Sequence, residues 1–176
     1  PARDLDRARE LLAKAGVPDG FSFQLLITPD EESIRVASLY AAMCREVGIE
    51  IDIQQGEFGS IISRMGEGNY TAAQIELSPR NDPDLSAYPW FHSQGGVNWS
   101  YYENEEMDDL LDRARASVDQ EYRRELYRQA LDIFNRDFPY IFTYHLQEMK
   151  AYRNNVKGYR HIPDSMMRFE DVWLAE

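Results

Sequence analysis

The apolar positions in the first part of the chain alternate between the period of a helix and that of a strand. Over the first fifteen residues they recur about every 3.6 positions, which predicts an amphipathic helix. The segment FSFQLLI, residues 21–27, predicts a strand, and residues 33–47 again follow the helical period. In IEIDIQ, residues 49–54, isoleucine alternates with polar residues, as in a strand with one buried face.

A short helix near residues 58–65 and a strand YTAAQIEL, residues 70–77, extend this into a β-α-β-α-β succession. Such a succession predicts an α/β fold in which helices cover a sheet. Connections of this length suit parallel neighbours joined by right-handed crossovers. We therefore expect an α/β domain with a mixed sheet flanked by helices.

The second part of the chain predicts two helices followed by two strands. Asn104 and Asp119 precede the helical periods, and both residue types accept hydrogen bonds from first-turn amides. PYIFTYHL, residues 139–146, and EMKAYR, residues 148–153, are interpreted as strands. The apolar stripes expected to face the core are Met107, Leu110, Leu111 and Ala114 in the first helix and Leu126, Ala130, Ile133 and Phe134 in the second.

Composition narrows the classes of partner. The 176 residues are 43% hydrophobic, as in a globular protein, and carry a formal net charge of −12. An acidic surface repels phosphate backbones and anionic lipid, so we expect no nucleic-acid partner. No apolar run reaches the roughly 18 residues that a membrane-spanning helix requires. The chain begins without methionine, and we expect it to be cut from a longer precursor.

The segment SPRNDPDLSAYPWFHSQGGVNWSYY, residues 78–102, has neither a helical nor a strand period. It combines prolines, aspartates, an arginine and aromatic rings, and we interpret it as a loop that faces a ligand. The candidate ligand contacts in this segment are Arg80, Asp82, Tyr88, Trp90, Asn98 and Trp99.

Several of these candidates also have a structural interpretation. A guanidinium can bind a carboxylate through two parallel hydrogen bonds, which suits Arg80 to an acidic ligand. The same group could pair internally with Asp82 or Asp84 and hold the shape of the loop. The sequence N-D-P-D is a turn signal in which aspartates bond nearby amides. The rings of Tyr88 and Trp90 could line a pocket or form a small core within the loop.

The ordered residues over nearly the whole chain resemble those of the family 5 extracellular solute-binding proteins. These receptors deliver peptides, nickel chelates, glutathione or opine-like compounds to ABC importers. The segments ELLAKAGVPDGFSFQLLIT and GIEIDIQQGEFGSIISRMGEGNYTAAQ match the family. Further matching positions are Asp82, Pro83, Asp84, Phe91, His92, Gly95, Gly96, Asn98, Tyr102, Asn104, Asp108, Leu110, Asp137, Pro139, Tyr140, Val156, Lys157 and Gly158.

The resemblance implies a division of the chain and a function. Members of the family are much longer and clamp their ligand between two lobes by hinge closure. Residues 1–151 would form the second lobe, of the type II periplasmic-binding-protein class, and residues 152–176 a tail that returns to the missing first lobe. Expected partners are a small peptide or other carboxylate-bearing solute and the permease subunits. The expected location is periplasmic or extracellular, with lipid anchoring as a family option.

At one position the chain departs from the peptide receptors of the family. These carry Trp-x-x-Asp before the Asp-Pro pair, and the aspartate pairs with the α-amino group of the ligand. Leu77 and Arg80 stand at these positions here, a pattern similar to that of the glutathione and opine branches. The resemblance therefore favours a ligand that presents a carboxylate. We also expect the isolated chain to bind weakly and to leave apolar side chains uncovered.

Enzymatic and metal-dependent functions find little support in the sequence. His92, His145 and His161 lack the spacing of a metal site, and Cys44 is the only cysteine. No nucleophile lies in a plausible frame, so we expect no catalysis, no metal and no cofactor. Two alternatives stay open: a receptor that senses its ligand for signalling, and an α/β enzyme domain that uses Asp82, Asp84 and His92.

Overall fold

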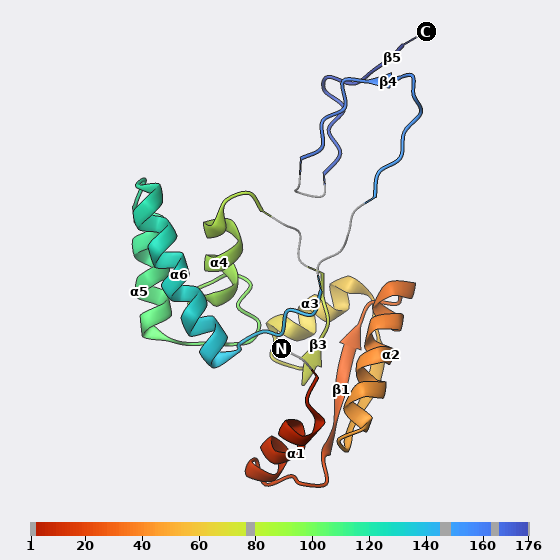
Figure 1. Cartoon of the computed structure of the whole chain (residues 1–176), viewed down its shortest axis with the longest axis vertical. Helices are drawn as coiled ribbons and strands as arrows, with labels where there is room; N and C mark the ends of the chain where they lie inside the picture. The colour runs from red at the N-terminus through yellow and green to blue at the C-terminus, as the bar shows by residue number, and fades with distance from the viewer. Residues whose placement is uncertain (1–2, 77–79, 145–148, 163–165, 176) are drawn as a thin grey trace. The chain divides into compact units, whose positions relative to one another are not determined.

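The computed structural model describes residues 3–76, 80–144, 149–162 and 166–175. By its internal contacts the chain divides into two compact units, Pro1–Glu76 and Leu77–Glu176. The first unit holds a sheet with its helices, and the second holds a group of helices and a small two-stranded sheet (Figure 1).

The first unit is built around a parallel three-stranded sheet in the order β2-β1-β3. Residues 21–27 and 49–54 form strands as predicted. Of the strand predicted over residues 70–77, the described part, residues 70–76, pairs at only two residues. The α/β class is confirmed, and the described pairings of this sheet are parallel, where a mixed sheet was expected. The elements of this unit are α1 (Leu5–Lys14), β1 (Phe21–Ile27), α2 (Glu31–Arg45), β2 (Ile49–Gln55), α3 (Phe58–Gly66) and β3 (Ala72–Ala73).

Helix α2 packs along the sheet and closes the core of this unit (Figure 1). Leu25, Ile27 and Ala37 are buried there, and the isoleucines Ile51 and Ile53 of β2 pack against them. The polar residues between these isoleucines are exposed, as the alternating pattern of β2 predicts. Helix α2 therefore covers one face of the sheet, and Leu26, on the opposite face of β1, is buried as well.

Two glycines fix the close approach of the turns that precede β1 and β2. Gly20 and Gly48 have φ angles of +90° and +86°, values that side chains other than hydrogen strongly disfavour. A Cβ atom on Gly20 would lie 1.9 Å from the carbonyl oxygen of Gly48. Any larger residue at position 20 would push the two turns apart and disturb the start of both strands.

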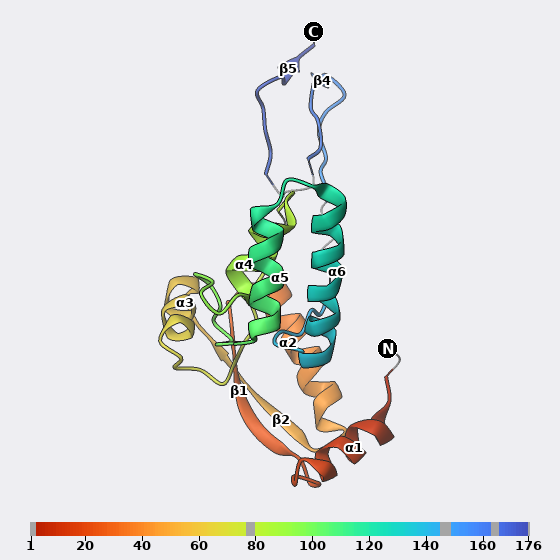
Figure 2. The same cartoon turned by 90° about the vertical axis from the view of Figure 1, so that its left-hand side faces the viewer.

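Among its described residues the second unit contains three helices that pack around one core. The helices are α4 (Pro83–Phe91), α5 (Glu105–Ala116) and α6 (Gln120–Asp137). Helices α5 and α6 run side by side in both views (Figures 1 and 2). All eight residues of the two predicted apolar stripes are buried in this core, which confirms the prediction. Helix α4 adds Ala87, Tyr88 and Phe91 to its edge.

The predicted N-caps of α5 and α6 are also confirmed. The Asn104 side chain accepts a hydrogen bond from the Met107 amide at 3.0 Å. Asp119 accepts hydrogen bonds from the amides of Glu121 and Tyr122 at 3.0 and 3.2 Å. Each cap satisfies amide groups that would otherwise lack a partner inside the helix.

The strands predicted over residues 139–146 and 148–153 are wrong for the described residues among them. Residues 139–144 and 149–153 have no strand assignment, and residues 145–148 lie outside the described part of the chain. The aromatic alternation in PYIFTYHL has another cause. The Phe142 ring lies 5.3 Å from the ring of Phe134 and 6.5 Å from that of Phe91, so it caps the helical core. Strand pairing appears further on, between β4 (Val156–Lys157) and β5 (Trp173–Leu174), which are antiparallel.

The carboxylate of Asp137, at the end of α6, ties this helix to the segment before α5. It accepts hydrogen bonds from the Tyr102 hydroxyl at 2.6 Å and from the side-chain amide nitrogen of Asn104 at 3.0 Å. The guanidinium of Arg136 also bonds to this carboxylate. Arg136 and then Tyr102 lower the pKa of Asp137 to about 2.

Replacing Asp137 by asparagine is expected to flatten the acid dependence of stability. The folded pKa of about 2 lies below the value of roughly 3.9 for an unfolded aspartate. The linked stability is therefore present above about pH 4 and is lost as the pH falls towards 2. Urea unfolding between pH 2 and 5 should show a smaller loss for Asp137→Asn than for the unaltered chain. Glu103→Gln, which neutralises an exposed carboxylate nearby, is the control; equal acid dependence in all three chains would contradict the assignment.

Candidate functional site

The irregular segment 78–102 contains a helix, so its interpretation as a loop throughout is wrong. Helix α4 covers Pro83–Phe91 and includes a second proline, Pro89, in its interior. The helix was missed because it has no apolar stripe and because proline usually ends helices. Pro83 occupies the first turn, where its missing amide hydrogen costs nothing.

Asp82 begins α4 and connects it to α6. Its carboxylate accepts a hydrogen bond from the Asp84 amide at 2.9 Å, as an N-cap does. The same carboxylate accepts a hydrogen bond of 2.6 Å from the Arg123 guanidinium of α6. The Asp84 amide, and to a smaller extent Arg123, lower the pKa of Asp82. The observed contacts of Asp82 thus agree with the interpretation in which aspartates of this segment bond nearby amides and hold its shape.

Asp84 and Tyr88 connect α4 to α5 through a single arginine. Arg115 donates to both carboxylate oxygens of Asp84 at 3.0 Å, the two-pronged geometry that arginine and carboxylate favour. The carbon at the centre of the Arg115 guanidinium lies 3.3 Å from the centre of the Tyr88 ring. Tyr88 also stacks on His92, with 4.1 Å between ring centres. These contacts orient Tyr88 towards α5.

His92 is the one buried residue with a polar side chain in the described core. Its Nδ1 atom accepts a hydrogen bond from the Gln94 amide at 2.9 Å, so in the neutral ring the proton lies on Nε2. The Nε2 atom lies 3.4 Å from a carboxylate oxygen of Asp112. Among the described residues no group of three histidine, cysteine, aspartate or glutamate side chains could hold a metal ion.

Trp90 and Trp99, two of the predicted residues, come together at the C-terminal end of α4. Their rings meet edge to face with 5.3 Å between centres, and Trp90 makes a similar contact of 5.8 Å with Tyr140. The Tyr140 hydroxyl accepts a hydrogen bond from the Ser100 amide at 3.2 Å. Tyr140 was not among the predicted site residues, because its aromatic run was interpreted as a strand.

Asn98 organises the turn that presents Trp99. Its amide nitrogen donates to the carbonyl oxygens of His92 and Tyr102, and its carbonyl oxygen accepts from the Tyr102 amide and from the Ser100 hydroxyl. The turn holds Tyr101 at a φ of +54°, in the left-handed region. Both polar atoms of the Asn98 side chain are therefore occupied within the turn.

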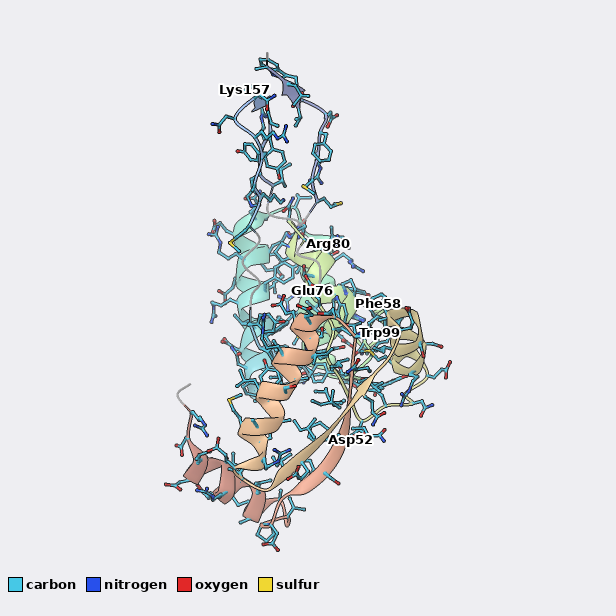
Figure 3. All side chains as sticks on the ribbon, turned by 90° about the vertical axis from the view of Figure 1, so that its right-hand side faces the viewer. Asp52, Phe58, Glu76, Arg80, Trp99 and Lys157 are labelled. Carbon is cyan, nitrogen blue, oxygen red and sulfur yellow. The ribbon has the colours of Figure 1, made fainter. Side chains whose placement is uncertain are left out.

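Arg80 lies just before α4 and is exposed (Figure 3). The alternative in which it pairs with Asp82 or Asp84 is not observed, because these carboxylates bind Arg123 and Arg115. Helix α4 has nine residues and spans about 13 Å. The structure thus places Arg80 and Asp82 at one end of α4, and Trp90, Asn98 and Trp99 at the other.

A hollow of about 460 Å³ lies beside the segment that follows α4. It is lined by Ser93, Gln94, Glu103, Asn104, Glu105 and Asp108, and none of the six predicted residues takes part. Asp108 is held in place by the Ser93 amide, which donates to it at 2.9 Å. The lining of this hollow is acidic, whereas the site expected around Arg80 would bind a carboxylate and therefore be basic.

No helix in the described residues is long and apolar enough to cross a membrane.

The sequence model of the bacterial extracellular solute-binding proteins, family 5 Middle, matches residues 1–98, more than half of the chain. Among curated proteins, the chain is 30% identical over 182 residues to di/tripeptide-binding protein 2 of Pseudomonas aeruginosa. The alignment covers 97% of this chain and 34% of that protein. It is 32% identical over 168 residues to heme-binding protein A of Haemophilus influenzae, covering 91% of this chain and 31% of that protein.

Among solved structures, a similar one is an ABC transporter-associated periplasmic binding protein of Helicobacter pylori in complex with a peptide. The two share 30% sequence identity with a TM-score of 0.81, over 98% of this chain and 35% of the other. The chain therefore spans about a third of the length of the proteins that it matches. The fold class of these structures agrees with the α/β architecture described above. The chain belongs to the bacterial extracellular solute-binding proteins of family 5.

Proposed function

We propose that this chain is the C-terminal lobe of the substrate-binding component of an ABC importer. The observation that carries the proposal is the match to binding proteins along almost the whole chain, at about a third of their length. Proteins of this class hold a ligand in a cleft between two lobes and close on it by a hinge. Binding and delivery to the permease subunits, without chemical change of the ligand, is the proposed activity.

Residues 1–151 are proposed to form the lobe and residues 152–176 a tail that packs on the missing first lobe. The exposure of the tail supports this division. Phe169, Trp173 and Leu174 are large apolar residues with more than half of their surface exposed. Apolar side chains gathered in this way usually mark a surface that another part of a protein covers.

The proposed ligand is a small peptide or another solute that presents a carboxylate. Arg80 supports this class, because its guanidinium has no acidic partner within the described residues and is free to bind one. The ring pair Trp90 and Trp99 would supply apolar contact at the other end of α4. Asp82, Tyr88 and Asn98 are proposed to act by holding α4 and its turns in place.

The proposed location is periplasmic or extracellular, and a lipid anchor in the full-length protein is an option that the family offers. The names of the relatives, which describe extracellular and periplasmic binding proteins, support it. The absence of nucleic acid from the proposed partners follows from the acidic net charge.

A thermal-shift screen of the full-length protein against di- and tripeptides, glutathione and opine-type acids tests the proposed function. A ligand that binds only the folded state raises the melting temperature in proportion to the logarithm of its concentration above Kd. We expect one of these acids to do so, and calorimetry to give a one-to-one complex. Residues 1–176 alone should show little or no shift with the same ligand, because half of the cleft is missing. Tight binding to the isolated chain, or no response of the full-length protein to any of these classes, would contradict the proposal.

A further inference from the structure

A small hollow in the C-terminal part of the chain combines basic and tyrosine side chains. It has a volume of about 270 Å³ and is lined by Lys150, Tyr152, Tyr159 and His161. The rings of the two tyrosines lie 5.5 Å apart, and the Lys150 ammonium lies 5.9 Å from the centre of the Tyr159 ring. None of these residues belongs to the ligand-binding candidates described above.

The four residues that line this hollow lie in a basic stretch of an otherwise acidic chain. Residues 149–162 contain two lysines, two arginines and a histidine but no aspartate or glutamate, whereas the whole chain has a net charge of −12. Within the described residues, Arg153, Lys157 and Arg160 form no ion pair. This segment therefore attracts negative charge where most of the protein surface repels it.

The Tyr159 hydroxyl indicates where a ligand atom belongs. Its oxygen is buried, yet it has no hydrogen-bond partner among the described residues. A buried polar group without a partner is costly, and in folded proteins such groups are nearly always satisfied. An acceptor that entered the hollow could accept a hydrogen bond from this hydroxyl while its negative charge faced Lys150 and His161.

We propose that this hollow binds a carboxylate, and that the carboxylate is an aspartate or glutamate side chain from the part of the polypeptide outside these residues. A carboxylate fits because it accepts hydrogen bonds and carries the charge that lysine and histidine complement. The source is inferred from two exposed side chains: Tyr152, which lines the hollow and is 60% exposed, and Met149, which precedes Lys150 in the chain and is 88% exposed. Exposed side chains of this kind favour coverage by protein over contact with water.

This inference rests on the proposed function in one respect, namely that these residues are one part of a longer two-lobed protein. The contact would be an ion pair that fixes the tail to the first lobe, separate from the ligand cleft. Its test uses the melting temperature of the ligand-free full-length protein. Failure of ligand binding in the earlier screen would leave this result unaffected, so the two proposals can fail independently.

Two variants of the full-length protein test the ion pair. Lys150→Gln removes the charge and is expected to lower the melting temperature by at least about 2 °C, because the buried carboxylate loses its counter-charge. Tyr159→Phe removes one oxygen atom and keeps the ring, so it is expected to fold and to melt at a lower temperature than the unaltered protein. The matched control is Lys157→Gln, since Lys157 lies in β4 of the same basic segment but does not line the hollow (Figure 3). It should change the melting temperature by less than about 1 °C.

The outcomes separate the proposed partner from the alternatives. An unchanged or higher melting temperature for Tyr159→Phe would mean that the hydroxyl has no partner in the full-length protein, and would overturn the proposal. Equal effects of Lys150→Gln and Lys157→Gln would do the same, because they would indicate a general loss of charge. Sodium acetate is then compared with sodium chloride at equal ionic strength. Stabilisation by acetate that disappears in Lys150→Gln would show that the hollow is open and takes free acids, which contradicts a side chain as occupant.

Discussion

Replacement of Arg80 by alanine in the full-length protein is expected to weaken the binding of a carboxylate ligand by a free energy of about 2–5 kcal/mol. In a closed cleft with little water, an arginine that binds a carboxylate through two hydrogen bonds is difficult to replace. The exposed position of Arg80 at the start of α4, with both nearby aspartates occupied by other arginines, makes its guanidinium available for this role. Isothermal titration calorimetry with the ligand found by thermal shift measures the change.

Two further variants sharpen this experiment. Arg80→Lys keeps the charge but loses the planar pair of donors, and should retain only part of the affinity. Arg124→Ala is the control, because Arg124 is an exposed arginine of α6 whose partner, Glu121, lies one turn away in the same helix. Full affinity in Arg80→Ala would exclude Arg80 as the anchor of the ligand.

Replacement of Leu111 by alanine is expected to lower the free energy of unfolding of the second unit by about 2–5 kcal/mol. Leu111 is 1% exposed and lies in the core between α5 and α6, so the shorter side chain leaves a cavity that the helices can fill only in part. Urea unfolding followed by tryptophan fluorescence isolates this unit, because Trp90, Trp99 and Trp173 all lie within Leu77–Glu176.

The same substitution on the outside of α6 provides the control. Leu131 is 55% exposed, and Leu131→Ala is expected to change the free energy of unfolding by less than about 0.5 kcal/mol. A similar loss in both variants would contradict the placement of the core between the helices.

Helices with a clear apolar period were predictable from the sequence, whereas the alternation over residues 139–144 was wrongly interpreted as a strand and the irregular site was predicted only in part. The stripes that contain Leu111 and Phe134 are buried as predicted, because periodic apolar residues define a core face whatever the partner is. Helix α4 was missed because it has no apolar stripe and contains Pro89, although Asp82 followed by Pro83 is a local signal for a helix start. The arginine partners of Asp84 and Asp82 lie on α5 and α6. These partners are 31 and 41 residues away along the chain, beyond the reach of any local pattern.

Separation along the chain also explains which contacts of the candidate site the sequence could indicate. Trp90 and Trp99 are close in sequence and meet in space, so their pairing could be anticipated from one segment. The contact of Trp90 with Tyr140 could not, because it requires the chain to pass through α5 and α6 before it returns. The Asn98 side chain has a donor and an acceptor, but only the structure shows that both form hydrogen bonds within the turn.

The two ion pairs that hold α4 to its neighbouring helices affect the free energy of ligand binding. Arg115 and Arg123 hold the start of α4 to α5 and α6, respectively, so this face of the proposed lobe would be ordered before the proposed ligand binds. A pre-ordered face loses little conformational entropy on association, so more of the contact energy remains as affinity. Removal of either ion pair should therefore weaken ligand binding mainly through a larger loss of conformational entropy, while the contacts of the ligand itself remain.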